Sequence, residues 1–140
     1  MNKKIITRQE MSDIAKQIIK ELPNKQIVTF SGPLGAGKTT LVQEVLKQMG
    51  VSKPVTSPTY TYVNVYKIQN GKTFYHFDLY RLNSVDEFID LGFNEYLNQP
   101  NIWCFIEWPQ VIDSLLDKQV VEVKLEHEAD DKRAVSVILK

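Results

Sequence analysis

Apolar residues recur at helical spacing in two parts of the chain. In residues 11–22 they fall every three or four positions, and Pro23 then breaks the pattern. Thr7 and Glu10, just before this segment, have the spacing of a capping box. In residues 39–49 the apolar positions again share one face, and Gly50 follows as a stop signal. We therefore expect two amphipathic helices, each with one face in the core.

Shorter apolar runs between turn residues predict strands. Residues 26–31 form one run, and residues 102–107 form the most continuous one, typical of a central strand buried on both faces. Residues 60–68 and 72–78 flank Asn70-Gly71, a two-residue hairpin signal, so the sheet is expected to be mixed. Further strands are expected at residues 4–7, 119–127 and 133–139, the last two as an antiparallel hairpin, and short helical segments at 84–91, 93–97 and 110–116.

Residues 32–39 read G-x-x-x-x-G-K-[ST], the phosphate-binding P-loop, between a predicted strand and a predicted helix. The glycines let the backbone curl so that successive N–H groups point at a polyphosphate, and the helix dipole favours the same anion. Lys38 can reach the β- and γ-phosphates, and the Thr39 hydroxyl can ligate Mg²⁺. The predicted nucleotide-binding residues of the loop are Gly35, Ala36, Gly37, Lys38, Thr39 and Thr40.

Two predicted strands end in a carboxylate. Asp78 closes one, in the manner of a Walker-B aspartate, and Glu107 closes the central one. Because ligands of open α/β sheets bind beyond the carboxyl ends of the strands, both should meet the P-loop there. We therefore predict a Mg·ATP hydrolysis centre. Spacing does not decide which carboxylate holds the metal and which orients water.

These patterns predict an α/β fold and one domain over residues 1–140. The expected architecture is a P-loop NTPase-like three-layer sandwich with a mixed, partly parallel sheet and C-terminal antiparallel strands. Seventeen basic and seventeen acidic residues cancel, which argues against a strong electrostatic grip on nucleic acid by this chain itself. The lone Cys104 is expected to be a buried small hydrophobe in a reducing cytosol. No apolar stretch has the length of a membrane span or of a signal peptide core, so we expect no membrane association.

Three further features have two interpretations each. Residues 51–61 are rich in proline and hydroxyl side chains; they are either a switch-like loop at the γ-phosphate or a polar surface loop, and the P-loop upstream favours the first. His76 alternates with aromatic residues and is expected to be a packing histidine rather than a catalyst. Arg133 follows a charged turn and could reach a nucleotide from the edge of the sheet.

Several motifs occur together in the order and spacing of one family. They are the GAGKTT of residues 35–40, the SPTYT of 57–61, the YHFDLYR of 75–81 and the EWP of 107–109. The chain thereby closely resembles the TsaE (YjeE) family of small bacterial P-loop ATPases over nearly its whole length. The resemblance implies a cytosolic ATPase required for N6-threonylcarbamoyladenosine in tRNA. It would bind TsaB and the transferase TsaD, reset that complex between turnovers, and meet tRNA only indirectly.

The resemblance also assigns roles to residues. Lys38 would hold phosphates, Thr39 and Glu107 would hold Mg²⁺, and Asp78 would position water at the γ-phosphate or act as an outer metal ligand. Thr59, in the switch-like loop, would sense the nucleotide. Supporting roles at the site or at the partner surface fall to Trp108, Tyr80 and Arg81.

One departure and three alternatives qualify this interpretation. The family usually has Asp where this chain has Pro33, which removes an acidic side chain and a backbone N–H from the loop. A small-molecule kinase would want a cationic lid, and the chain has only three scattered arginines. A GTPase should carry Asn-Lys-x-Asp after the P-loop, whereas Asn24-Lys25 precedes the P-loop and is not followed by the final Asp. A non-enzymatic nucleotide-dependent scaffold is the hardest alternative to separate.

Overall fold

The computed structural model describes residues 3–58, 61–68, 71–116 and 120–140. Its strands are β1 (Lys4–Ile6), β2 (Ile27–Ser31), β3 (Val63–Lys67), β4 (Thr73–Asp78), β5 (Ile102–Glu107), β6 (Val120–His127) and β7 (Arg133–Leu139). Its α-helices are α1 (Met11–Glu21), α2 (Lys38–Gln48) and α3 (Val85–Asp90), with 3₁₀ segments η1 (Leu22–Asn24), η2 (Phe93–Asn98) and η3 (Pro109–Leu115). Each predicted element is present, although the segment expected as a short helix after Trp108 is 3₁₀.

The strands form one mixed sheet in the order β1-β7-β6-β2-β5-β4-β3. β2 runs parallel to both β5 and β6, and β4 runs parallel to β5. β3, β7 and β1 add antiparallel strands at the two sides. The predicted mixed sheet with a C-terminal antiparallel hairpin is therefore confirmed. Of the hairpin signal, Gly71 has the expected positive φ of 84°, and Asn70 lies outside the described residues.

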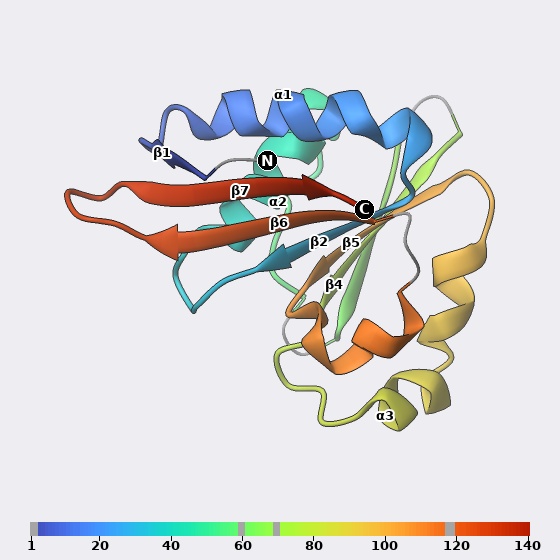
Figure 1. Cartoon of the computed structure of the whole chain (residues 1–140). Coiled ribbons are helices and arrows are strands. Elements are labelled where there is room, and N and C mark those ends of the chain that lie inside the picture. The colour runs from blue at the N-terminus through green and yellow to red at the C-terminus, as the bar shows by residue number, and fades with distance from the viewer. Residues whose placement is uncertain (1–2, 59–60, 69–70, 117–119) are drawn as a thin grey trace.

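Helices cover both faces of the sheet, which gives the predicted three layers (Figure 1). α1 and α2 pack together on one face over a core that includes Phe30, Phe74 and Phe105. α3, η2 and η3 lie on the other face over a second core that includes Phe77 and Phe88. All six residues of β5 are buried, as expected of a central strand covered on both faces.

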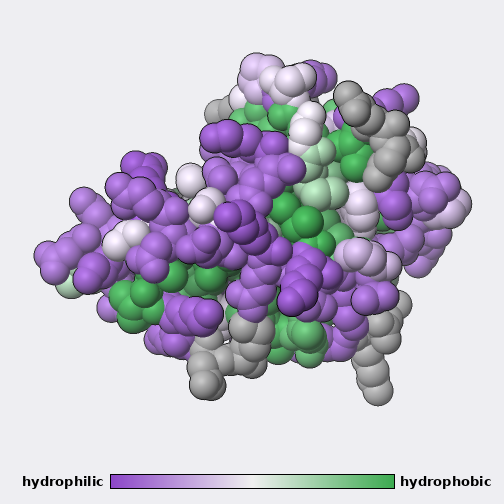
Figure 2. All heavy atoms as spheres, turned by 90° about the horizontal axis from the view of Figure 1, so that it is seen from above, coloured by the Kyte–Doolittle hydropathy of each residue, from purple (hydrophilic) through white to green (hydrophobic). Residues whose placement is uncertain are grey.

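The amphipathic pattern of α1 explains its position. Met11, Ile14, Ala15 and Ile18 are buried, which leaves its polar side chains outward. Seen from above, on the side of α1, the surface is largely hydrophilic, with apolar side chains visible mainly between the polar ones (Figure 2). None of the described helices has the length and apolar character needed to cross a bilayer.

The start of α1 differs from the predicted capping box. The Glu10 carboxylate accepts from the Thr7 backbone N–H at 3.0 Å, as that motif requires, but the Thr7 hydroxyl also donates to it at 3.0 Å. Since the hydroxyl points at the carboxylate, the Glu10 N–H donates to the Thr7 carbonyl instead, at 3.1 Å. A turn is thereby formed first, and the helix begins at Met11.

Candidate functional site

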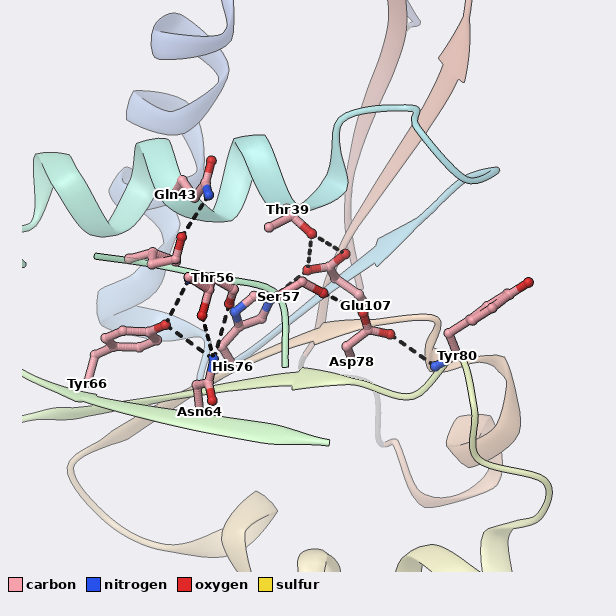
Figure 3. Close-up of polar contacts among 11 residues, drawn as sticks. Thr39, Gln43, Thr56, Ser57, Asn64, Tyr66, His76, Asp78, Tyr80 and Glu107 are labelled. Carbon is pink, nitrogen blue, oxygen red and sulfur yellow. Dashed lines mark hydrogen bonds and ion pairs between the residues drawn. The ribbon is translucent and has the colours of Figure 1, made fainter. Parts of the chain in front are cut away.

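Strand pairing brings the two predicted carboxylates together. Asp78 and Glu107 are direct partners in the parallel β4–β5 register, each as the last residue of its strand. Side chains alternate along a strand, so both lie on the face of Phe74 and Phe105, which is the face that α2 covers. Both carboxylates are buried, Asp78 at 5% and Glu107 at 2% exposure. The expectation that they meet at the carboxyl edge of the sheet holds in the structure (Figure 3).

The P-loop connects β2 to α2 over this edge. Gly35 and Gly37 have φ of 76° and 105°, values that L side chains rarely adopt. A Cβ on Gly32 would lie 2.3 Å from the carbonyl oxygen of Leu125 in β6, so the loop is held against that strand. Gly37 is the N-cap of α2 and offers no side chain to the first N–H groups of the helix. The loop therefore presents backbone donors in the arrangement that binds phosphate.

Lys38 is folded back under its own loop. Its Nζ donates to the carbonyl oxygens of Gly32 and Pro33, at 3.0 Å for Pro33. The same Nζ lies 3.8 Å from the ring centroid of Trp108, a cation–π contact. Burial lowers the pKa of Lys38, while the negative charges of Glu107 and Asp78 oppose that shift in part. The ammonium is thus held in place at the site by backbone oxygens and an aromatic face.

Glu107 is the hub of a buried polar chain. The Thr39 hydroxyl lies 3.0 and 2.9 Å from its two carboxylate oxygens. On the other side, Oε2 lies 2.6 Å from Nε2 of His76, whose side chain is fully buried. The first residues of α2 are therefore joined to β5 and β4 through one carboxylate (Figure 3).

Asp78 is bound to the loop that follows α2. Ser57 donates its hydroxyl proton to Oδ2 at 2.9 Å, and the Tyr80 backbone N–H donates to Oδ1 at 3.0 Å. Asp78 therefore connects the end of β4 to the predicted switch-like segment.

That segment is tied down at several further points. Gln43 of α2 donates to the carbonyl oxygen of Val55 at 2.7 Å, and Asn64 of β3 donates to that of Thr56 at 3.1 Å. The Thr56 N–H donates to the Tyr66 hydroxyl at 3.3 Å. Residues 51–58 contain no helix or strand, in agreement with the loop predicted for this part of the chain. Thr59, predicted to sense the nucleotide, lies outside the described residues.

Trp108 and Tyr80 form one rim of the site. Their rings lie 4.9 Å apart, and Tyr80 is 51% exposed. Trp108 has φ of 58°, a strained backbone for a bulky residue, which places its ring over Lys38. Arg81 is exposed and lies outside the lining of the cleft, so its predicted supporting role stays a prediction.

Arg133 lies where the sequence suggested, but it contacts the loop backbone. Its Nε donates to the carbonyl oxygen of Ala36 at 3.0 Å, and Nη2 lies 3.5 Å from that of Gly35. His127, at the end of the same hairpin, places Nε2 3.2 Å from the carbonyl oxygen of Leu34. The β6–β7 hairpin thus supports the outer half of the P-loop. A direct nucleotide contact by Arg133 stays a prediction.

The P-loop, the two strand-end carboxylates and Trp108 line one cleft of about 860 Å³. Besides the P-loop, Asp78, Glu107 and Trp108, its walls include three further groups: Thr7, Arg8, Gln9 and Met11; Ser57 and Tyr80; and Asp130, Asp131 and Arg133. The volume is in the range of small-molecule sites.

The donor chemistry of the cleft fits Mg²⁺. Thr39 and Glu107 supply a hydroxyl and a carboxylate in contact, and hard oxygen ligands are what this cation prefers. Within the described residues no cluster of three or more histidine, cysteine or acidic side chains could hold a metal by itself. Mg²⁺ is commonly held by one or two protein groups together with substrate phosphates and water, which is the arrangement this cleft could provide.

Sequence reasoning missed the contacts of His76 and His127. The link from His76 to Glu107 was open to inference, since period-two alternation puts His76 on the same face as Asp78, one strand away from Glu107. The contact of His127 with Leu34 joins residues 93 apart in sequence, and nothing local signals it.

Comparison with known proteins gives one consistent answer. The sequence profile of the family described as threonylcarbamoyl adenosine biosynthesis protein TsaE matches residues 5–135. A Rickettsia conorii protein named tRNA threonylcarbamoyladenosine biosynthesis protein TsaE is 40% identical over 133 residues, covering 94% of this chain and 74% of its own length. Proteins of the same name from Haemophilus influenzae and Bacillus subtilis are 39% and 30% identical, covering 89% and 94% of this chain and 77% and 80% of their own lengths.

A solved structure agrees with the sequence comparisons. The crystal structure of Bacillus subtilis YdiB superposes with a TM-score of 0.71 at 26% identity, covering 97% of this chain and 83% of that one. The family profile spans the P-loop, both strand-end carboxylates and the loop between them. The chain belongs to the TsaE family of threonylcarbamoyladenosine biosynthesis proteins.

Proposed function

We propose that this protein is the Mg²⁺-dependent ATP hydrolase of tRNA N6-threonylcarbamoyladenosine synthesis, and that it acts on a complex of TsaB and TsaD in the cytosol. Its own hydrolysis is slow and is stimulated by that complex, and it meets tRNA only through its partners. Family membership supports the pathway, and the resemblance of the motifs supports the partners.

One observation carries the proposal: the Thr39 hydroxyl contacts the Glu107 carboxylate at 2.9 Å, beneath the P-loop and beside Asp78. This places a hydroxyl and two carboxylates next to a phosphate-binding loop. A protein that only bound phosphate would need the loop, but it would have no use for two buried carboxylates of like charge next to the anion. A divalent cation held by Thr39 and Glu107 would offset this repulsion.

The chain's own residues have distinct tasks in this proposal. The N–H groups of Gly35 to Thr40 and the Lys38 ammonium bind the phosphates, while Thr39 and Glu107 hold Mg²⁺. The cation, when bound, neutralises charge on the phosphate oxygens. Asp78 orients the attacking water, and Ser57 holds its second carboxylate oxygen at 2.9 Å. Thr59, one of the proposed catalytic residues, would complete the site from the loop.

Reconstitution tests the proposal. The chain is combined with TsaB, TsaD, tRNA, a threonylcarbamoyl donor and ATP, and both released phosphate and modified nucleoside are measured over many turnovers. We expect Lys38→Ala and Glu107→Ala to lose complex-dependent hydrolysis and sustained modification. Lys47→Ala, an exposed lysine of the same helix, should behave as wild type.

Three results would contradict parts of the proposal. If Glu107→Ala keeps full complex-dependent hydrolysis, the assignment of Glu107 as a Mg²⁺ ligand is wrong. If cells carrying Lys38→Ala still modify their tRNA normally, the proposed role of ATP hydrolysis is wrong. If Asp78→Asn binds ATP, fails to hydrolyse it and still sustains modification, the protein is a nucleotide-dependent scaffold.

A further inference from the structure

His76 is a buried polar side chain in direct contact with the proposed metal ligand. It lies in β4, two residues before Asp78, and is 0% exposed. Its Nε2 is 2.6 Å from Oε2 of Glu107. Its other ring nitrogen, Nδ1, is buried and has no hydrogen-bond partner among the residues that the structure describes.

This arrangement assigns the proton on the ring. Oε2 of the carboxylate is an acceptor, so Nε2 carries the hydrogen and donates it. In the neutral ring Nδ1 presents a lone pair, which is cheaper to leave unpaired in a protein interior than an N–H group. A histidine kept only for packing would gain nothing from this geometry, since an apolar side chain would fill the same space without an unpaired nitrogen.

Glu107 has contacts on two sides, and they differ in kind. Thr39 sits in the first turn of α2, next to the P-loop, and its hydroxyl can rotate. His76 sits in β4 between β3 and β5, with Asn64 and Phe105 as its strand partners, and its ring is fully buried. His76 is therefore the fixed partner of the Glu107 carboxylate. Thr39, whose hydroxyl can rotate, is the partner on the side of the phosphate site.

We infer that His76 is a positioning residue that holds Glu107 in the orientation needed to bind Mg²⁺. This rests on the proposed function, because it presumes that Glu107 is the metal ligand. Donation from Nε2 to Oε2 sets the plane of the carboxylate, and in that plane its two oxygens lie 3.0 and 2.9 Å from the Thr39 hydroxyl beside the P-loop. Side chains that hydrogen-bond to a metal ligand without touching the metal orient that ligand in advance and so raise metal affinity.

Two variants separate positioning from packing. His76→Leu removes the donor with an apolar side chain of similar size, and His76→Gln keeps an N–H donor at a similar reach. ADP binding is measured by calorimetry on the purified chain, once with Mg²⁺ and once with a chelator. The quantity of interest is the factor by which Mg²⁺ increases ADP affinity. We expect His76→Leu to reduce this factor about 10-fold, with ADP affinity in chelator unchanged, and His76→Gln to restore most of it.

A second measurement needs neither metal nor nucleotide. The chain has two histidines, so long-range ¹H–¹⁵N NMR spectra of the ligand-free protein are readily assigned by the loss of signals in His76→Gln. We expect the His76 ring to carry its hydrogen on Nε2 near neutral pH. Phe74→Leu, a packing change on the same face of β4, serves as the control: it should lower stability and leave the Mg²⁺ factor as in wild type.

The outcomes separate this inference from the proposed function. If wild type binds ADP equally well with and without Mg²⁺, the proposed function loses its metal site and the positioning role falls with it. If wild type shows the Mg²⁺ factor but His76→Leu keeps it, only the positioning role is wrong. The positioning role is also wrong if His76→Leu weakens ADP binding equally with and without Mg²⁺, or if Nδ1 carries the only hydrogen on the His76 ring.

Discussion

Replacing Gly32 by alanine tests how the P-loop is held against the sheet. The added Cβ would lie 2.3 Å from the Leu125 carbonyl oxygen, where ordinary contact begins at 3.4 Å. Leu125 belongs to β6, and neighbouring Lys124 is paired with Ser31 at the end of β2. The clash therefore falls on two backbones that the sheet locks together, and no flexible side chain can absorb it.

The cost of Gly32→Ala can be worked from two parts. Overpacking against fixed neighbours costs about 1–3 kcal/mol, and a strained φ, here 151°, adds about 1–2 kcal/mol. We expect a loss of about 3 kcal/mol in the free energy of unfolding. With a slope of about 2 kcal/mol per molar, the urea midpoint falls by about 1.5 M.

Gly50→Ala is the matched control. Gly50 also has a positive φ, of 90°, but nothing lies within 4 Å of its added Cβ. It should cost only the backbone strain, about 1 kcal/mol. Urea unfolding followed by circular dichroism compares the three proteins. If Gly32→Ala is no less stable than Gly50→Ala, the loop moves away from β6 freely and the argument for a rigid contact fails.

Two further predictions concern groups whose pKa values the fold shifts. Burial raises the pKa of the Cys104 thiol to about 12, so a thiol reagent should leave the native protein unlabelled near neutral pH and label it fully in denaturant; rapid native labelling would show that β5 opens. Burial lowers the folded-state pKa of Lys38 below its ordinary 10.5, so unfolding takes up a proton between the two values and stability rises with pH in that window. Lys38→Met abolishes this proton uptake, so its free energy of unfolding relative to wild type should fall as pH rises through the window. Urea unfolding of both proteins at several pH values tests this. If their free energies of unfolding change in parallel with pH, the pKa of Lys38 is not lowered.

The sequence was informative where chemistry is local. Five contiguous apolar residues followed by a carboxylate predicted the central strand β5, and a motif of fixed spacing predicted the P-loop between β2 and α2. The carboxylates could be placed because each ends a strand, and parallel strands share an edge. Their direct pairing, Asp78 opposite Glu107, follows from register, which one strand alone does not specify.

The features that the sequence did not predict depend on contacts between segments that are distant in the chain. β6 pairs with β2 on the side away from β5, so the C-terminal hairpin lies beside the P-loop. Nothing in the pattern of either strand specifies that neighbour. Arg133 was expected to reach a nucleotide from the edge of the sheet. Its contacts with the carbonyl oxygens of Gly35 and Ala36 could not be predicted, because the sequence does not show that the hairpin lies beside the P-loop.

Pro33 shows why a departure from the family pattern is compatible with the loop. Its carbonyl oxygen accepts from Lys38 Nζ at 3.0 Å and from the Ala36 N–H at 3.2 Å. Both contacts use the backbone oxygen, which proline retains. The N–H and the acidic side chain that proline lacks would lie at an exposed position, where water can replace what they offer. The shape of the loop therefore depends on carbonyl oxygens at this position, and its charge at the phosphate side is set by Lys38.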